Sequence, residues 1–469
     1  MFDSVFELAM AQVDLSVKNG TIVMSTCLIQ AGVAVKDGKI VAIASDANLP
    51  DASRTIDAAG LFVLPGIIDV HVHLRDPGYT YKEDFGCGTS AAAAGGITCV
   101  FDMPNNNPPV KDVTALRKKV DVAEAKAVVD YGLYGLLTTG NLHEVKPLAE
   151  AGVIGYKCFM GETLGNVGPP SDGEMLDQFT DVGCLDLRVS VHAENDPILQ
   201  YRIDKLRKEG RGDAYAHYES RPHIVEEEAV NRAILYARDT KCKLHIAHLS
   251  SMQGVALLRE AKQEGQLITA ETTPHYLILD DNNYSEIGSR MKVNPSIKTK
   301  VDRTSLWSAL NDGTIDMIVS DHAPQSVEEK SKPNIFDCIS GFSGLETSVP
   351  LMLTQVRKGL ISLSKYVQLT SENPARAWRI YPQKGCIAVG SDADLTIVDV
   401  NLKGRIDPAK FLSKSKLSPF EGFEFEGAPV YTIVRGNVVM DHGKVDGKVR
   451  GRMVRPIANA KNPTLGHEK

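Results

Sequence analysis

From residue 96 to residue 160 the chain reads GITCVFDM (96–103), VTALRKKVDVAEAKAVV (113–129), DYGLYGLL (130–137), HEVKPLAEAG (143–152) and VIGYKCFM (153–160). Short runs rich in β-branched and aromatic residues alternate here with longer stretches of helix-forming residues. This alternation predicts a parallel sheet whose strands are joined by crossover helices.

The same alternation continues on both sides of this stretch, for example from LRVSVHAEN (187–195) to QLITAETTPHY (266–276). About eight strand–helix units fit into the roughly 310 residues between 66 and 381, which favours a closed TIM (β/α)8 barrel over an open sheet. No glycine-rich nucleotide-binding motif opens any of the helices. We therefore expect an α/β barrel as the domain at 66–381.

The two ends of the chain differ from this central part. DLSVKNGTIV (14–23), AGVAVKDGKIVAIAS (31–45), DADLTIVDV (392–400) and APVYTIVRGNVVM (428–440) alternate apolar and polar residues. Asn-Gly and Asp-Gly pairs supply tight turns between some of these segments. Two β-rich ends predict one small sheet domain that is built from both termini, residues 1–65 plus 382–469.

Composition narrows the classes of function. Hydrophobic residues make up 43% of the 469 residues and charged residues 24%, as in average soluble globular proteins. The net charge of −7 argues against nucleic-acid and membrane-surface partners, and no apolar run is long enough to span a bilayer. The N-terminal stretch MFDSVFELAMAQVDLSVKNG has no cationic segment, so it is a poor signal peptide. Eight scattered cysteines without a CxxC pair indicate reduced thiols and a cytoplasmic enzyme.

Histidines and an aspartate mark the ends of several predicted strands. His71 and His73 follow the run LFVLPGIIDV, and their spacing directs both imidazoles to one side of a strand. His192 lies in LRVSVHAEN, His248 in KLHIAHLSS, and Asp321 follows TIDMIVS. The C-terminal ends of barrel strands converge on one face, where barrel enzymes have their active sites. One such histidine alone is usually structural, but the five residues together predict a metal site.

Lys157 lies in VIGYKCFMG, which has the composition of a buried strand end. An unpaired ammonium group is costly there. The residue is therefore either a salt-bridged or snorkelling structural lysine, or a lysine that carbon dioxide has converted to a carbamate. A carbamate is an anionic oxygen ligand that can bridge two cations.

Longer motifs add a resemblance to a known family. They include GIIDVHVHLRDPG (66–78), GYKCFMGE (155–162), TTPHY (272–276), KVNPSIKT (292–299) and DGTIDMIVSDHAP (312–324). In combination, and over about residues 15–450, they resemble the cyclic amidohydrolase family of dihydroorotases, allantoinases and hydantoinases. The resemblance implies a distorted TIM barrel with two divalent metal ions, usually zinc, and a β-sandwich domain split between the termini.

On the matching positions, the resemblance also implies a ligand set. One metal would take the HVH pair, the carboxylated lysine and the aspartate: His71, His73, Lys157 and Asp321. The other would share the lysine and take the two remaining histidines: Lys157, His192 and His248. His245 and His322 fall outside this pattern, and we interpret them as structural or supporting residues. A water between two cations is acidified, and Asp321 is the expected catalytic group that moves its proton to the leaving nitrogen.

Four further positions match substrate-binding residues of the family. Arg75, Asn105 and His275 match the residues that hold the substrate carboxylate in dihydroorotases, and Asn294 matches a residue that contacts the ring amide. A guanidinium fork suits an anionic substrate. The first prediction is therefore a dihydroorotase, which interconverts N-carbamoyl-L-aspartate and L-dihydroorotate in pyrimidine synthesis.

The alternative is an allantoinase or hydantoinase that acts on a five-membered ureide ring. GETLGNVGPPSDGEM (161–175), GFSGLETSVPLML (341–353) and the tail from 415 to 436 resemble those enzymes as much as dihydroorotases, and Gln325 stands where a histidine is more usual. Dihydropyrimidinases carry a tyrosine at the position of Glu162, which counts against them. A non-catalytic scaffold relative and a mononuclear deaminase, which would not need Lys157, remain more distant alternatives.

The expected partner is a small cyclic amide, with no nucleic acid and no membrane. The family implies a homo-oligomer, a dimer or a tetramer. The segment VEEKSKPN (327–334) follows the Asp321 strand and is either a mobile loop or a lid over the pocket.

Overall fold

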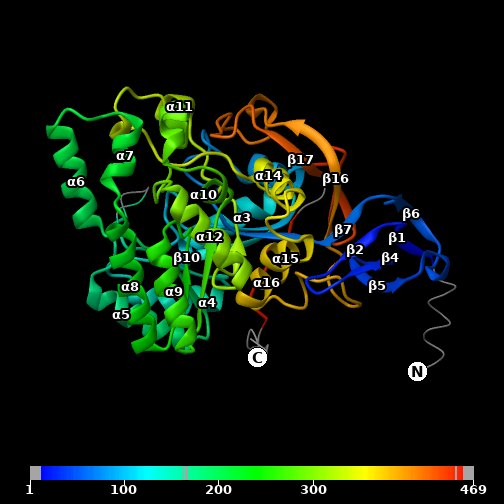
Figure 1. Cartoon of the computed structure of the whole chain (residues 1–469). Coiled ribbons are helices and arrows are strands. Elements are labelled where there is room, and N and C mark those ends of the chain that lie inside the picture. The colour runs from blue at the N-terminus through cyan, green and yellow to red at the C-terminus, as the bar shows by residue number, and fades with distance from the viewer. Residues whose placement is uncertain (1–11, 162, 164–166, 449–450, 458–469) are drawn as a thin grey trace.

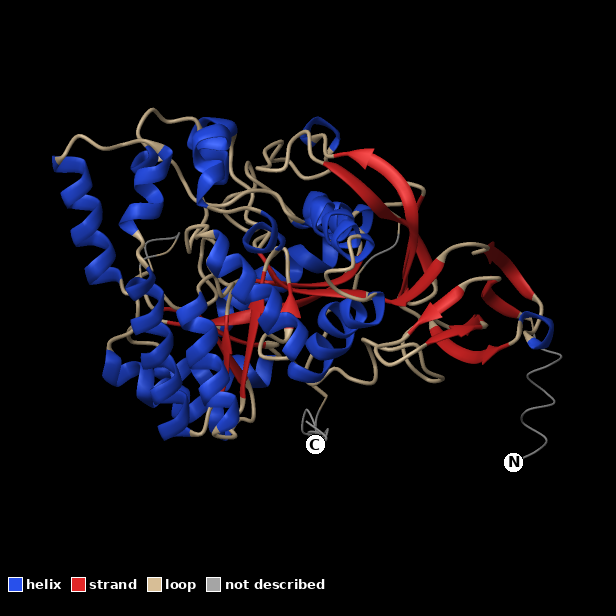
Figure 2. Cartoon of the chain, viewed as in Figure 1, coloured by secondary structure: helices blue, strands red, loops and turns tan. Residues whose placement is uncertain are grey.

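The computed structural model describes residues 12–161, 163, 167–448 and 451–457. Most of the N-terminal stretch that we judged a poor signal peptide, and Glu162, lie outside these residues. The described part of the chain forms a helix-covered barrel with β-sheets beside it (Figures 1 and 2). The N-terminal strands lie at one end of the molecule, and the helices of residues 172–263 lie at the other (Figure 1).

The barrel consists of eight parallel strands in sequence order: β8 (Ile67–Val72), β9 (Ile97–Asp102), β10 (Asp130–Leu137), β11 (Gly155–Phe159), β12 (Arg188–His192), β13 (Lys243–Ile246), β14 (Ile268–Thr272) and β15 (Met317–Ile318). Val72 pairs with His322 in parallel, and the His73 backbone N–H donates to the His322 carbonyl at 2.7 Å. These contacts join the two edges of the sheet. Because β15 has only two regular residues, the closure is short, and the distorted TIM barrel expected from the sequence is confirmed.

Helices and helical turns surround the strands. The described α-helices of at least five residues are α2 (Phe85–Ala94), α3 (Val113–Lys126), α4 (Val145–Ala151), α5 (Asp172–Cys184), α6 (Asp196–Lys208), α7 (Ala214–Ser220), α8 (His223–Thr240), α9 (Met252–Gln263), α10 (Pro274–Ile278), α12 (Lys300–Asp312), α14 (Leu345–Arg357), α15 (Leu363–Val367) and α16 (Asn373–Ala377). Local sequence fixes several of their starts. Ser171 and Glu174 form a capping box at α5, and the Asp112 side chain accepts from the backbone N–H of Ala115 at α3.

The chain ends form two packed sheets. One has the order β5 (Lys39–Ala44), β4 (Gly32–Lys36), β1 (Val13–Lys18) and β6 (Ala52–Asp57). The other has the order β19 (Lys444–Val445), β18 (Asn437–Asp441), β17 (Glu424–Val434), β16 (Leu395–Arg405), β7 (Phe62–Pro65), β2 (Thr21–Val23) and β3 (Leu28–Gln30). Buried side chains from both ends of the sequence, including Leu15, Val35 and Ile397, form one apolar cluster between them. The sheet domain built from both termini is therefore confirmed.

The domain division at residues 65 and 382 stays a prediction. Residues 451–457 follow the last sandwich strand and return to the barrel, where the Val454 backbone N–H donates to the Tyr131 carbonyl at 2.7 Å. Lys384, just after the predicted boundary, donates to Asp130 on β10 at 2.6 Å. The two parts of the molecule are thus joined by several chain segments.

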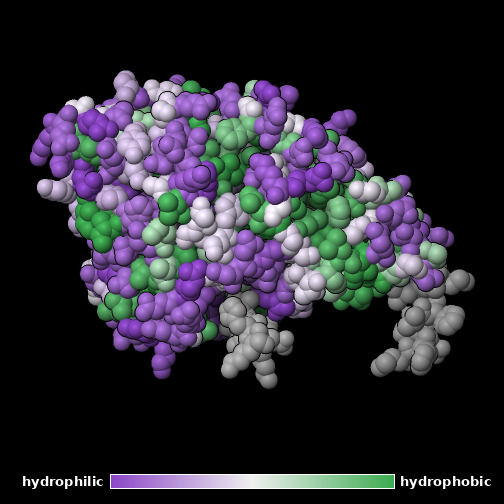
Figure 3. All heavy atoms as spheres, in the orientation of Figure 1, coloured by the Kyte–Doolittle hydropathy of each residue, from purple (hydrophilic) through white to green (hydrophobic). Residues whose placement is uncertain are grey.

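The surface is mostly polar on the face shown in Figure 3, with hydrophobic residues gathered near β2 and β7. Among the described residues, no helix combines the length and the apolar character that crossing a membrane requires.

Candidate metal centre

Three of the predicted ligands form a compact group at the C-terminal end of the barrel strands. His71 and His73 come from β8 and the residue after it, and Asp321 follows β15. The Asp321 Oδ1 atom lies 3.4 Å from His71 Nε2 and 3.7 Å from His73 Nε2. All three side chains are buried, and each offers a ligand atom within 4.8 Å of the others. This geometry suits a single cation held by two imidazoles and a carboxylate.

The other two predicted histidines form a second group beside the first. His192 Nδ1 lies 3.0 Å from His248 Nε2, and the ring centroids of His248 and His71 are 5.2 Å apart. His248 is buried, and its Nδ1 atom has no hydrogen-bond partner among the described residues. The four predicted histidines, which come from three strands, therefore lie in one contiguous cluster.

Lys157 lies on β11 at the same end of the barrel. Its side chain is completely buried, and its Nζ atom has no hydrogen-bond partner in the described part of the chain. Burial lowers the pKa of Lys157 to about 8, although the negative charges of Glu271 and Asp321 oppose this shift. An unpaired buried amine of this kind fits a lysine that reacts with carbon dioxide and becomes a metal ligand.

The imidazoles of His71 and His73 are held in the neutral form that binds metals. Burial, followed by the positive charge of Lys157, lowers the pKa of His71 to about 4. Burial, followed by the charge of Arg75, also puts the pKa of His73 well below its ordinary value. Burial raises the pKa of Asp321, and its interactions with the neighbouring His71 and Lys157 limit that rise.

Glu271 on β14 is a site residue that the sequence did not reveal. Its carboxylate accepts hydrogen bonds from His71 Nδ1 and from the His248 backbone, the latter at 3.2 Å. The available signal was a charged residue inside the apolar run QLITAETTPHY. His245, which we interpreted as a supporting residue, lies 2.9 Å from the other Glu271 oxygen.

Backbone conformation is unusual at this end of the barrel. Arg75, His248 and Asp321 have positive φ angles of 62°, 36° and 47°. Non-glycine residues rarely adopt this region, and such strain is concentrated at functional sites. Here it directs side chains from strand ends toward the histidine cluster.

The predicted substrate residues fall into two pairs. Arg75 and His275 are buried, and Arg75 Nη1 and His275 Nε2 have no hydrogen-bond partner among the described residues. Asn105 Oδ1 instead contacts His73 Nδ1 at 2.8 Å, and the side-chain Oδ1 of Asn294 accepts from the Ser340 hydroxyl at 2.9 Å. Arg75 and His275 therefore have atoms available for a substrate, while the two asparagines also support neighbouring groups.

The segment at 327–334 contains the short helix α13 (Val327–Lys330). Glu329 pairs with Lys82 at 2.8 Å, and the buried Lys330 donates to the Lys292 carbonyl at 2.7 Å. These contacts attach the segment to neighbouring loops. Its mobility and its role as a lid stay predictions.

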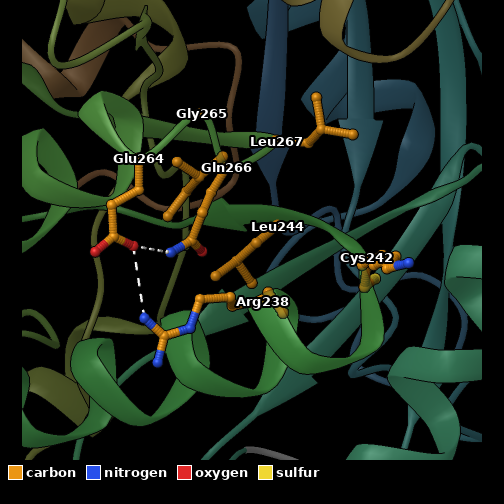
Figure 4. A pocket seen from close by; sticks show the side chains of 10 residues that line it. Arg238, Cys242, Leu244, Glu264, Gly265, Gln266 and Leu267 are labelled. Carbon is orange, nitrogen blue, oxygen red and sulfur yellow. Dashed lines mark hydrogen bonds and ion pairs between the residues drawn. The ribbon is translucent and has the colours of Figure 1, made fainter.

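Two other regions of the described chain could be mistaken for functional sites. A cavity of about 340 Å³ lies at the N-terminal ends of β13 and β14, where Leu244 and Leu267 line it and Glu264 contacts Arg238 and Gln266 (Figure 4). It lies at the other end of these strands from the histidine cluster. A second group of buried carboxylates gathers around the Lys384 ammonium: Asp130, Asp392 and Asp394.

The chain is similar to one protein family over most of its length and to enzymes with related names. The model of the Amidohydrolase family matches residues 62–439. An L-hydantoinase of Paenarthrobacter aurescens is 39% identical over 437 residues, which cover 92% of this chain and 95% of that protein. An allantoinase of Solibacter usitatus (strain Ellin6076) is 36% identical over 447 residues, which cover 94% of this chain and 97% of that protein.

Solved structures agree with these relatives. The L-hydantoinase (dihydropyrimidinase) from Arthrobacter aurescens superimposes with a TM-score of 0.92 at 38% identity, covering 95% of this chain and all of that one. A dihydropyrimidinase from Brevibacillus agri NCHU1002 gives a TM-score of 0.89 at 32% identity, covering 94% of this chain and 98% of that one.

Proposed function

The chain belongs to the amidohydrolase family, and on this premise we propose that it opens the ring of a hydantoin or a related five-membered cyclic ureide. It is a hydrolase that acts on cyclic amides. Relatives named hydantoinase and allantoinase favour our alternative prediction over dihydroorotase, which they do not support. The observation that carries the proposal is the histidine cluster beside the buried, unpartnered Lys157.

The donor set fits two divalent cations, and zinc suits its imidazole and carboxylate ligands. His71, His73 and Asp321 would hold one cation, and His192 and His248 the other. When bound, the cations would supply an acidified water and polarise the ring carbonyl. Lys157 would join them as a carbamate, which forms when its neutral amine adds carbon dioxide and releases a proton.

Asp321 is the proposed acid–base residue. Ring opening forms a carbon–oxygen bond and breaks the carbon–nitrogen bond of the amide, so one proton must move from water to the leaving nitrogen. The Asp321 carboxylate lies against both His71 and His73 and is buried, which supports its assignment as the group that would accept this proton. Burial raises its pKa and makes the carboxylate a better proton acceptor.

Arg75 and His275 are the proposed residues for a polar substituent of the ring. Their unpartnered nitrogens supply a guanidinium donor and an imidazole nitrogen beside the histidine cluster. Asn105 and Asn294 would complete the substrate-binding set, as the sequence predicted. A buried guanidinium with an unused donor favours an anionic or strongly polar substituent.

The test is a substrate panel with metal-loaded protein. Hydantoin carrying an acetate substituent and dihydroorotate are isomers, and both open to N-carbamoyl-aspartate, so ring size is the difference between them. We expect the five-membered ring to open faster. Allantoin, methyl-substituted hydantoin and dihydrouracil complete the panel, and activity on six-membered rings alone would overturn the proposal.

The variant Arg75→Gln tests whether Arg75 binds the polar substituent of the ring. The variant should lose ~10-fold or more in kcat/KM for the acetate-substituted hydantoin, about the contribution of one charge-assisted hydrogen bond. It should lose much less for the methyl-substituted hydantoin. Equal losses on both substrates would contradict a role for Arg75 in binding the substituent.

A further inference from the structure

We infer that Glu271 is a positioning residue that ties the two halves of the metal centre together through a single carboxylate oxygen. The inference rests on the proposed metal-dependent function. Glu271 lies on β14, is almost completely buried, and comes from a strand that contributes none of the predicted metal ligands.

The first half of the centre is connected through His71. The Glu271 Oε1 atom faces His71 Nδ1 at hydrogen-bond distance. Because a carboxylate can only accept, His71 carries its proton on Nδ1, and its lone pair is on Nε2. Nε2 is the atom that faces Asp321 at 3.4 Å. Glu271 thus selects the tautomer of His71 that directs a ligand atom into the centre.

The second half is connected through the backbone. The same Oε1 atom accepts the backbone N–H of His248 at 3.2 Å. His248 has a φ angle of 36°, and a non-glycine residue holds this conformation only where neighbouring groups fix it. The hydrogen bond secures the strained residue whose Nε2 atom lies 3.0 Å from His192.

The other oxygen of Glu271 is anchored away from the centre. Oε2 lies 2.9 Å from His245 Nε2, and His245 Nδ1 lies 2.9 Å from the Thr269 hydroxyl. The His245 ring also packs edge-on against Trp378, with centroids 4.9 Å apart. These contacts fix the orientation of the carboxylate, so Oε1 is presented to both halves of the centre.

Glu271→Gln tests this role, because an amide carries no negative charge and has only one accepting oxygen. The measurement is the zinc affinity of purified protein by competition with a chromogenic chelator. We expect the dissociation constant for zinc to rise ~10- to 100-fold, the usual effect of removing a carboxylate that supports a histidine ligand. A purely structural role of Glu271 would lower the melting temperature of the metal-free protein and leave zinc affinity unchanged. A positioning role would lower zinc affinity.

Glu226→Gln is the matched control. Glu226 is an equally buried glutamate on α8, and it accepts from the Ser250 backbone and hydroxyl, both at 2.9 Å. The same substitution there should leave zinc affinity within ~2-fold of the wild type, since Glu226 contacts none of the predicted ligands. An equal loss of zinc affinity in both variants would overturn the inference.

The remaining outcomes are also decisive. If Glu271→Gln does not fold, Glu271→Asp keeps the charge but withdraws it from His71, and it should weaken zinc in the same direction. Unchanged zinc affinity in a folded Glu271 variant overturns this inference but does not affect the proposed function. A wild-type protein that binds no stoichiometric zinc instead overturns the proposed function.

Discussion

Two buried lysines of this protein, Lys384 and Lys157, lie near carboxylates but differ in their ion pairs and in the direction in which their pKa is shifted. Lys384 contacts Asp130 at 2.6 Å, Asp394 at 2.5 Å and Asp392 at 3.2 Å. Burial opposes its charge, yet the surrounding carboxylates raise its pKa. Lys157 has no hydrogen-bond partner among the described residues, and burial lowers its pKa to about 8.

This difference separates a carboxylate group whose charge a lysine neutralises from a histidine cluster in which, among the described residues, no lysine is ion-paired. In the sandwich–barrel junction the chain provides the cation itself, as Lys384, and the three aspartates need no metal. At the histidine cluster, His192 Nδ1 faces His248 Nε2, and both His71 and His73 direct Nε2 at Asp321. The nearby Lys157 ammonium has no hydrogen-bond partner among the described residues. Under the proposed function, metal ions would provide the positive charge at this cluster, and Lys157 would become an anionic ligand.

Lys157→Ala should have the largest effect. Without the proposed carbamate the centre would lose an anionic ligand, so the metal content should fall below two ions per chain. Turnover should fall by ~10³-fold or more, which corresponds to several kcal/mol of transition-state stabilisation. Elemental analysis and a ring-opening assay check both values. Full activity in this variant would favour a mononuclear centre without a lysine ligand.

Asp321→Asn is expected to separate chemistry from folding. The amide cannot take up the proton of the attacking water, so kcat should fall by ~10²- to 10⁴-fold. Thermal unfolding of the metal-free variant should change little, because the burial that disfavours the Asp321 charge is partly offset by its interaction with Lys157. Asp394→Asn is the control, and it should show lower stability with normal kcat. Near-normal turnover in Asp321→Asn would contradict the acid–base role of Asp321.

Lys384→Met should lower stability and leave the chemistry intact. Removing one partner of a buried ionic group leaves unpaired charges, which typically costs ~3–5 kcal/mol. Chemical denaturation measures the loss, while zinc content and kcat of the folded fraction should match the wild type. A fall in zinc content or kcat in the folded variant would contradict a purely structural role for Lys384.

A third buried lysine, Lys330, gives an effect that is seen as a change of stability with pH and not as a loss of activity. Lys330 donates to a backbone carbonyl and pairs with no carboxylate among the described residues, and burial, followed by the charge of Lys292, lowers its pKa from 10.5 to about 7. Between about pH 7 and 10.5 the unfolded chain binds a proton that the folded chain does not, so wild-type stability rises with pH. Lys330→Met lacks this contribution. The stability of Lys330→Met relative to the wild type should therefore be highest near pH 7 and fall as pH increases. Denaturation curves at several pH values test this, and a constant difference would contradict it.

The fold could be predicted from the sequence because its signals are local. Strand–helix alternation indicated the barrel, and the alternating termini with their Gly turns indicated the sheets. Long-range contacts had no such signal. Nothing local shows that residues 451–457 return to β10, or that the barrel closes through Val72 and His322 beside a two-residue β15.

The residues at the strand ends of the candidate site could be predicted from the sequence, but their supporting contacts could not. His71, His73, His192, His248 and Asp321 could be grouped because the ends of parallel strands meet on one face. Glu271 was missed because a single carboxylate inside a strand does not show which neighbours it contacts. Whether Arg75 has a free donor depends on packing around it, so its availability for substrate became apparent in the folded chain.

The most direct test of the account is the activity of protein from which divalent cations have been removed. Chelated protein should remain folded and lose ring-opening activity. About two equivalents of zinc per chain, added with bicarbonate as a source of carbon dioxide for Lys157, should restore it. Undiminished hydrolysis by metal-free protein would contradict the account.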